Sequence, residues 1–232
     1  MEIQEFAPRH LIAQFGFQKK QASVVDRRGA LAGELQELLG ASSASLDPTA
    51  AEVTTRDGMN KFRIGMVQLV AVLNIDDFDD DMRKVEDFFQ RGMDLLDAPP
   101  LAQVVAHTSD VAAVPSFDDL RDGLLEALSS TSSRLRDAVG IPLSDLGWSY
   151  DFDDDRWIVQ VRIGPMRDDE LRQLFEAPDA TDFPAASLFV DVKAKLRVGD
   201  SKKDSLDLWA SALERNRQIT ANLTAWLTEA LA

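Results

Sequence analysis

Aspartates are the residues of this chain with the greatest capacity for chemistry, and they gather in two short clusters. Residues 76–81 hold five aspartates and residues 151–155 hold four. Converging carboxylate oxygens are the ligands that Ca²⁺ and Mg²⁺ prefer. A calcium loop of the EF-hand type also needs glycine at its sixth position and glutamate at its twelfth. Counted from Asp151 these positions hold Arg156 and Arg162, and the other cluster fails in the same way, so neither is a loop of this type.

A divalent-metal hydrolase that uses Asp151, Asp153 and Asp155 together with a histidine is one hypothesis that this spacing leaves open. The ordinary interpretation of that cluster is the solvated tip of a hairpin. The ordinary interpretation of the first cluster is helix capping, because carboxylates stabilise the positive end of the helix dipole. Neither cluster by itself predicts catalysis.

Histidine is scarce, since His10 and His107 are the only two. Both fall in predicted strands. With a carboxylate they could form a metal site or an acid–base pair if the fold brings them together, whereas a local hydrogen bond within each strand is the simpler interpretation. The chain has no Gly-x-Ser-x-Gly elbow, no Gly-rich phosphate loop and no cysteine. These absences remove several enzyme classes and thiolate metal sites, and we expect no cofactor.

The net charge is −15, from 40 acidic and 25 basic residues. A field of this sign repels nucleic-acid phosphates and anionic lipid headgroups and favours a basic protein partner. We therefore expect neither direct nucleic-acid binding nor membrane binding. The longest aliphatic run, at 69–73, is far shorter than the ~20 apolar residues of a membrane helix. Together with the missing signal region and the missing cysteine, this favours the cytoplasm.

Hydrophobic periodicity predicts the elements that position these residues. In the first half we expect strands over 10–17, 52–56, 62–75 (with a bulge or turn at Gly65) and 101–114, helices over 30–39 and 79–96, and a loop over 41–48.

In the second half, a capping pattern predicts a helix that begins at Ser116. A final amphipathic helix begins at Asp200 or Ser201 and runs to about Ala230. Between them we expect helix to about 139, a hairpin of strands 148–152 and 157–163, a surface excursion over 167–183, and a half-buried strand over 186–198.

This order of elements predicts an α+β fold, with a mainly antiparallel sheet or sheets and long packed helices. Two halves, 1–115 and 116–232, meet near Pro115, and each holds antiparallel-type strands and one long helix. Both a duplicated α+β unit and packing as one domain stay open, because no internal sequence repeat is evident.

The last helix carries the strongest interaction feature. Asn216 and Thr220 interrupt its apolar stripe, and Trp209 and Trp226 flank it. Polar residues at packing positions can fix the register of helix pairs, and tryptophans are frequent interface anchors. We predict self-association or a partner contact through this helix, against the alternative of a helix packed on its own sheet. The residues expected to contact a partner are Asp77, Asp79, Asp80, Asp81, Asp154, Trp209, Asn216 and Trp226.

The layout resembles a sporadically distributed family of bacterial proteins of unknown function and similar length. The shared features are a Pro-x-x-x-Ile strand at 8–12, a strand followed by a helix over 67–96, a Leu-x-x-Asp-Val strand at 188–192 and an Ile-Thr pair at 219–220. The chain departs from the family at 106–109, where Ala-His-Thr-Ser replaces an Arg-Tyr-x-Asn type of strand. The resemblance implies a fold and no particular activity.

Three functions follow from these observations. The leading hypothesis is a non-enzymatic, acidic protein-interaction module that docks a basic partner, as a subunit of a bacterial multi-protein assembly or a defence-type system. The second is an immunity or antitoxin-like inhibitor of a basic protein, or a mimic of nucleic-acid charge, which needs carboxylates on one continuous face. The third is the metal-dependent hydrolase described above.

Overall fold

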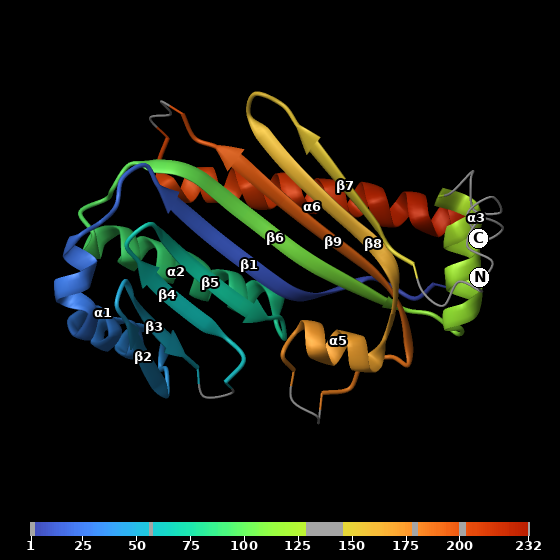
Figure 1. Ribbon diagram of the computed structural model, residues 1–232, viewed down its shortest axis with the longest axis horizontal. Coiled ribbons are helices and arrows are strands. Elements are labelled where there is room, and N and C mark those ends of the chain that lie inside the picture. The colour runs from blue at the N-terminus through green and yellow to red at the C-terminus, as the bar shows by residue number, and fades with distance from the viewer. Residues whose placement is uncertain (1–2, 56–57, 129–145, 178–180, 200–202, 232) are drawn as a thin grey trace.

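A single antiparallel sheet of nine strands forms the centre of the molecule (Figure 1). The computed structural model describes residues 3–55, 58–128, 146–177, 181–199 and 203–231. The strands lie in the order β2-β3-β4-β5-β1-β6-β9-β8-β7. Their bounds are β1 Ala7–Phe17, β2 Ser43–Asp47, β3 Ala50–Thr54, β4 Lys61–Gly65, β5 Gln68–Asn74, β6 Leu101–Ala113, β7 Trp148–Asp153, β8 Trp157–Arg167 and β9 Ala186–Arg197.

The described helices cover the two faces of this sheet unequally. The helices are α1 Ser23–Leu39, α2 Phe78–Leu95, α3 Phe117–Leu128, α5 Asp168–Leu174 and α6 Ser205–Leu231. Buried side chains of α1, α2, α3 and α6 pack on one face, whereas α5 packs on the other. Figure 1 shows α6 behind the sheet and α5 in front of it. The other described helices leave the front face uncovered, and the predicted α+β class is confirmed.

The order of elements repeats on the two sides of the central β1–β6 pair. On one side β1 pairs with β5 and α2 follows β5; on the other side β6 pairs with β9 and α6 follows β9. Both β1 and β6 are followed by a helix, α1 and α3 respectively. Since β1 and β6 also pair with each other, one sheet runs without interruption through both sides.

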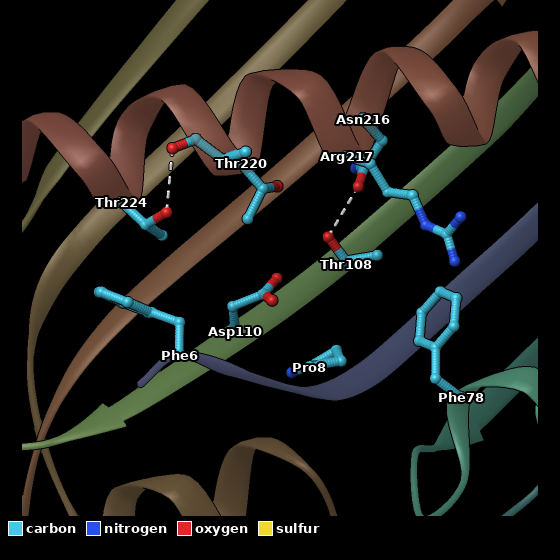
Figure 2. Close-up of a pocket in the computed structure, with 10 residues that line it drawn as sticks. Phe6, Pro8, Phe78, Thr108, Asp110, Asn216, Arg217, Thr220 and Thr224 are labelled. Carbon is cyan, nitrogen blue, oxygen red and sulfur yellow. Dashed lines mark hydrogen bonds between the residues drawn. The ribbon is translucent and has the colours of Figure 1, made fainter. Parts of the chain in front are cut away.

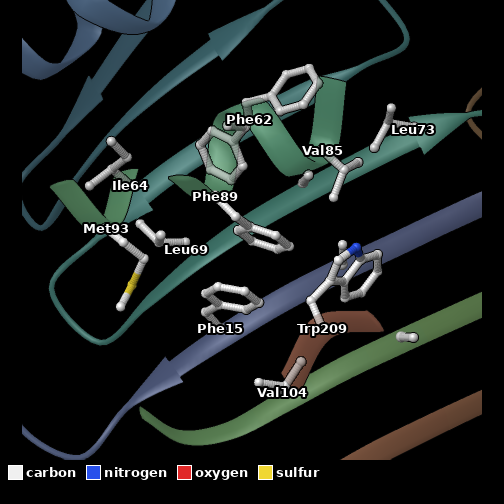
Figure 3. Close-up of a cluster of buried hydrophobic side chains, with 14 of the residues drawn as sticks. Phe15, Phe62, Ile64, Leu69, Leu73, Val85, Phe89, Met93, Val104 and Trp209 are labelled. Carbon is white, nitrogen blue, oxygen red and sulfur yellow. The ribbon is translucent and has the colours of Figure 1, made fainter. Parts of the chain in front are cut away.

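Aromatic residues fill the core under the helix-covered face (Figure 3). The ring of Phe15 stacks on Phe89 with 3.8 Å between centroids, and Trp209 meets Phe89 edge-on at 5.6 Å. Trp209 is fully buried. Its predicted contact with a partner is therefore wrong, because the indole anchors α6 to the chain's own sheet and to α2.

Several local predictions are corrected by the structure. The expected loop at 41–48 contains the edge strand β2, whose polar residues pair with β3. The stretch 167–183 is no surface excursion: Leu171, Phe175 and Phe183 form a third core with β6 and β9. The strand β9 is consequently buried on both faces over its first seven residues, since α6 covers one face and α5 the other.

The remaining helix and turn predictions differ in their bounds. Helix α1 begins at Ser23, seven residues before the expected start at Ala30. The final helix begins at Ser205, where Asp204 Oδ1 accepts from the backbone N–H of Leu206 at 2.8 Å. Gly65 ends β4 before a turn into β5. The expected caps at 200–201 and the expected helix over 129–139 lie outside the described residues. No described helix combines the length and the hydropathy that a membrane crossing requires.

Candidate functional site

A row of polar residues crosses the face of the sheet on which α5 packs. The register pairs Ser109 of β6 with His10 of β1 on one side and with Asp191 of β9 on the other, and Asp191 in turn pairs with Arg162 of β8. His107 lies two residues before Ser109, so its side chain is on the same face. The sheet thus brings both histidines of the chain close to one buried aspartate.

Asp191 is the centre of this network. His107 Nε2 lies 2.7 Å from Asp191 Oδ1, and the hydroxyl of Ser109 donates to the same oxygen at 2.7 Å. Burial on its own raises the pKa of the Asp191 carboxyl, but the hydrogen bond and charge of His107, the hydrogen bond of Ser109 and the charge of Arg162 outweigh burial and lower it. The carboxylate is therefore ionised at neutral pH, and His107 Nε2 donates to it.

His10 stays uncharged at neutral pH. Burial lowers the pKa of its imidazole to about 4, and the positive charge of His107 adds to this effect. The ring stacks on Phe175 of the segment after α5, with 5.5 Å between centroids. His10 is therefore a weak base whose ring packs against the ring of Phe175.

These residues line a pocket of about 520 Å³ on this face of the sheet, here called the open-face pocket. Its walls are largely apolar and include Trp148, Phe175 and Phe189. Leu174, with 46% of its surface exposed, lies at the rim. The carboxylate of Glu170, which also lines it, accepts from the backbone N–H of residue 167 at 2.7 Å and caps α5.

The geometry of the open-face pocket is not that of an activated nucleophile. Nucleophilic catalysis by serine requires a base that accepts the serine proton. Here Ser109 and His107 both donate to Asp191, and the described residues show no hydrogen bond between them. Asp191 of β9 therefore fixes the register of β9 against β6. These hydrogen bonds suit a binding site better than a site of acyl transfer.

A second pocket lies on the opposite face of β6, under α6, and is here called the Asp110 pocket (Figure 2). Its volume is about 330 Å³. Asn216 fastens α6 beside it: its Oδ1 accepts from the Thr108 hydroxyl at 2.8 Å, and its Nδ2 donates to the carbonyls of Val192 (2.6 Å) and Ala106 (3.2 Å). Asn216 is fully buried. The prediction that it contacts a partner is wrong, because its polar atoms bind the sheet beneath.

The first aspartate cluster caps α2. Asp77 Oδ1 accepts from the backbone N–H groups of Asp79 and Asp80 at 3.1 Å each. Asp80 and Asp81 both pair with Lys84, at 2.8 and 3.2 Å. Asp81 is 3% exposed, so its predicted partner contact is wrong. Capping, the ordinary interpretation of this cluster, describes its geometry.

The second cluster forms the end of the β7–β8 hairpin. Asp151 accepts from Gln160 Nε2 at 2.8 Å, and Asp153 pairs with Arg197 at 2.8 Å. Asp154 accepts from the backbone N–H groups of the turn at 2.7 and 2.6 Å. Over the described ranges, no group of three or more histidines and acids is placed to hold a metal ion. The aspartates of the two clusters therefore bind mainly to residues of their own helix or hairpin.

Trp226 is 43% exposed and stays available to a partner.

The chain has no match among protein-family models and none among curated proteins.

Sequence reasoning named the two histidines but missed Asp191, Arg162, Ser109 and Asp110. Two of these carry a signal that could have found them. Asp110 and Asp191 each interrupt a run of buried strand residues, and a charged residue in such a run needs a partner in the fold.

Proposed function

We propose that this chain is a non-enzymatic protein-interaction module, and that a partner protein inserts an apolar side chain into the open-face pocket. The observation that carries this proposal is the chemistry of the pocket lining. Its walls are apolar, and its central polar groups, Asp191, His107 and Ser109, hydrogen-bond with one another. Pockets of this size and composition are typical of binding sites with a few orienting polar groups.

The charges of the pocket favour an uncharged anchor. Arg162 stands opposite Asp191, and Glu170 pairs with Arg167 at 3.5 Å. Both acids of the pocket therefore have partners, and a cationic anchor would find no unpaired carboxylate there. The net charge of −15 disfavours an anionic anchor. In the described part of the chain the guanidinium of Arg162 has no hydrogen-bond partner. It can therefore donate to backbone carbonyls of a bound segment.

The charge of the whole chain favours basic residues next to that anchor. With a net charge of −15, the protein attracts positively charged segments over a distance of about one Debye length, roughly 8 Å at physiological salt. The partner segment is thus an apolar residue flanked by lysine or arginine. The absence of cysteine accords with a cytoplasmic role, and a place as one subunit of a multi-protein assembly follows from the same proposal.

Binding of short peptides tests this proposal. Basic peptides with a central phenylalanine, leucine or tryptophan, and the same peptides with serine at the centre, are titrated by fluorescence anisotropy. The Leu174→Glu variant places a charge at the pocket rim. Leu46→Glu is the matched control, because Leu46 is 55% exposed on the edge strand β2, several strands away. We expect apolar-centred peptides to bind at least tenfold more weakly to Leu174→Glu than to the control.

Two results would contradict the proposal. One is equal binding of serine-centred and apolar-centred peptides, which would leave only charge attraction. The other is equal loss of binding in both leucine variants, which would place the peptide elsewhere.

The alternative of an acidic inhibitor or charge mimic has less support. It requires carboxylates on one continuous face. The β7–β8 hairpin forms one edge of the sheet, whereas α2 packs with β1 and β5, and both clusters engage local partners. A calorimetric titration with Mg²⁺, Mn²⁺ and Ca²⁺ tests the alternative of a metal-dependent hydrolase. That alternative requires a saturable heat of metal binding, and a titration without one would exclude it.

A further inference from the structure

The Asp110 pocket is a site separate from the open-face pocket, because it lies on the helix-covered face of the sheet. Thr108 and Asp110 of β6 form one wall, and Thr220 of α6 lies opposite (Figure 2). Phe6 and Pro8, at the start of β1, close the pocket on its apolar side. The pocket therefore combines a small polar centre with hydrocarbon surface.

Two polar atoms in this pocket have no hydrogen-bond partner within the described part of the chain. They are Asp110 Oδ2 and Thr220 Oγ1. Asp110 is 8% exposed and Thr220 is 9% exposed. In Figure 2 the carboxylate of Asp110 points toward Thr220 across the pocket. Buried polar groups are nearly always hydrogen-bonded, because an unpaired group forfeits its hydration without compensation. The two atoms thus indicate a ligand with hydrogen-bond donors.

Two neighbouring polar residues of the same pocket, Thr108 and Asn216, have hydrogen-bond partners. Thr108 donates to Asn216, and Asn216 donates to two backbone carbonyls. The polar atoms around Asn216 therefore have hydrogen-bond partners, whereas Asp110 Oδ2 and Thr220 Oγ1 have none among the described residues. Trp209 Nε1, elsewhere on α6, is also without a partner among the described residues, but Asp110 Oδ2 and Thr220 Oγ1 belong to two residues that line one pocket.

The charge of Asp110 narrows the class of ligand. Burial raises the pKa of its carboxyl to about 6, the charge of Asp191 adds to this, and the Thr108 hydroxyl partly opposes it. At neutral pH the buried carboxylate is still mostly ionised, and it needs a cationic partner. Arg217 does not supply one: its guanidinium lies over the ring of Phe78, 4.4 Å from the centroid.

A metal ion fits this pocket poorly. Hard cations take six or more oxygens, whereas the described residues offer no cluster of three metal-binding acids or histidines here. An organic ammonium group needs only a few acceptors, and its hydrocarbon part can lie on apolar surface. The pocket offers both.

We propose that the Asp110 pocket binds a small organic amine. Its ammonium group donates to Asp110 Oδ2 and Thr220 Oγ1, and its hydrocarbon part lies against Phe6 and Pro8. The volume of about 330 Å³ admits an amine of the size of an amino acid or of phenethylamine.

The test uses a panel of amines from methylamine to phenethylamine, titrated into the full chain at pH 7.5 by calorimetry and by thermal shift. We expect saturable binding and a raised Tm for at least one larger amine. The Asp110→Asn variant should bind that amine at least tenfold more weakly, and Thr220→Val several-fold more weakly. Asp207→Asn, which changes an exposed acid in the first turn of α6, is the matched control and should bind as the wild type does.

Three outcomes would overturn the proposal. They are the absence of saturable binding across the panel, equal binding by Asp110→Asn, and equal binding by the neutral analogue 2-phenylethanol. Circular dichroism confirms that each variant is folded. Leu174→Glu should leave amine binding unchanged, so a failure of the interaction proposal and a failure of the amine proposal are distinguishable.

Discussion

Two buried aspartates on opposite faces of the sheet have opposite surroundings. Asp191, on the open face, accepts hydrogen bonds from His107 and Ser109 and lies opposite Arg162. Asp110, on the helix-covered face, has one carboxylate oxygen without a partner among the described residues. Burial raises the pKa of both carboxyls, but only at Asp191 do the neighbours outweigh it. The buried carboxylate of Asp191 therefore stabilises the chain's own fold. The buried carboxylate of Asp110 instead indicates a ligand.

The largest expected effect comes from removing the satisfied aspartate. Asp191→Ala leaves His107 and Ser109 without their shared acceptor inside the sheet. Leaving a buried donor without its acceptor costs about 1–3 kcal/mol, and two donors lose their acceptor here. We expect the free energy of unfolding at pH 7, measured by urea denaturation, to fall by about 4 kcal/mol. A fall below about 1 kcal/mol would contradict the structural role of Asp191.

Replacing Asp110, whose Oδ2 has no partner among the described residues, should raise the free energy of unfolding instead of lowering it. The folded-state pKa of Asp110 is raised to about 6, so its ionisation destabilises the fold as the pH rises through the range between its unfolded and folded pKa values. Asp110→Asn should be more stable than the wild type at pH 7, by up to about 3 kcal/mol. The difference should vanish near pH 3.5. Urea denaturation at both pH values checks this, and a less stable variant at pH 7 would contradict it.

Because the pKa of His10 is lowered in the fold, we expect the free energy of unfolding to fall in acid. The folded-state pKa of His10 is lowered to about 4, so protons bind the unfolded chain more tightly. The stability that neutral His10 contributes is present above its unfolded pKa and is lost as the pH falls toward the folded pKa. At pH 4.5 this loss is about 2.5 kcal/mol relative to pH 7.5. His10→Asn should remove that part of the pH dependence, and an unchanged slope between pH 7.5 and 4.5 would count against it.

The smallest expected effect belongs to Thr220. Its hydroxyl is buried without a partner in the described structure, and valine has nearly the same shape. Replacing an unpaired buried hydroxyl by a methyl group should stabilise the fold by about 0.5 kcal/mol. Thermal unfolding of Thr220→Val without ligand measures this. Ser211→Ala is the control, because the Ser211 hydroxyl donates to the carbonyl of Asp207 and its loss should not stabilise the chain.

Much of the fold follows from sequence periodicity. The stripe of α2 and the alternation in β5 and β8 are long enough to define their elements. The strand β2 is missed because its composition, Ser-Ala-Ser-Leu-Asp, is that of a loop, and only pairing with β3 makes it a strand. The burial of α5 is missed because its apolar residues cover the second face of β9, and a single sequence does not show that this face is covered.

The candidate sites depend on contacts that are distant in sequence. His107 and Asp191 are 84 residues apart and meet only through the pairing of β6 with β9. No local pattern encodes that register. The aspartate clusters are the reverse case: their partners lie within a few residues, so the local interpretation of capping could be made from sequence. The stripe of the last helix predicts a partner contact for Trp209 and Asn216, which are buried against the sheet, because helical periodicity does not distinguish a sheet from a partner protein.

The central claim is that the two buried aspartates differ in what satisfies them, and one measurement tests it directly. Carboxyl carbon chemical shifts, followed by NMR from pH 2 to pH 8 in the unliganded protein, give both pKa values in a single titration. The account predicts a pKa of about 6 for Asp110 and a pKa below the usual aspartate range for Asp191. Two ordinary values, or a higher pKa at Asp191 than at Asp110, would contradict it.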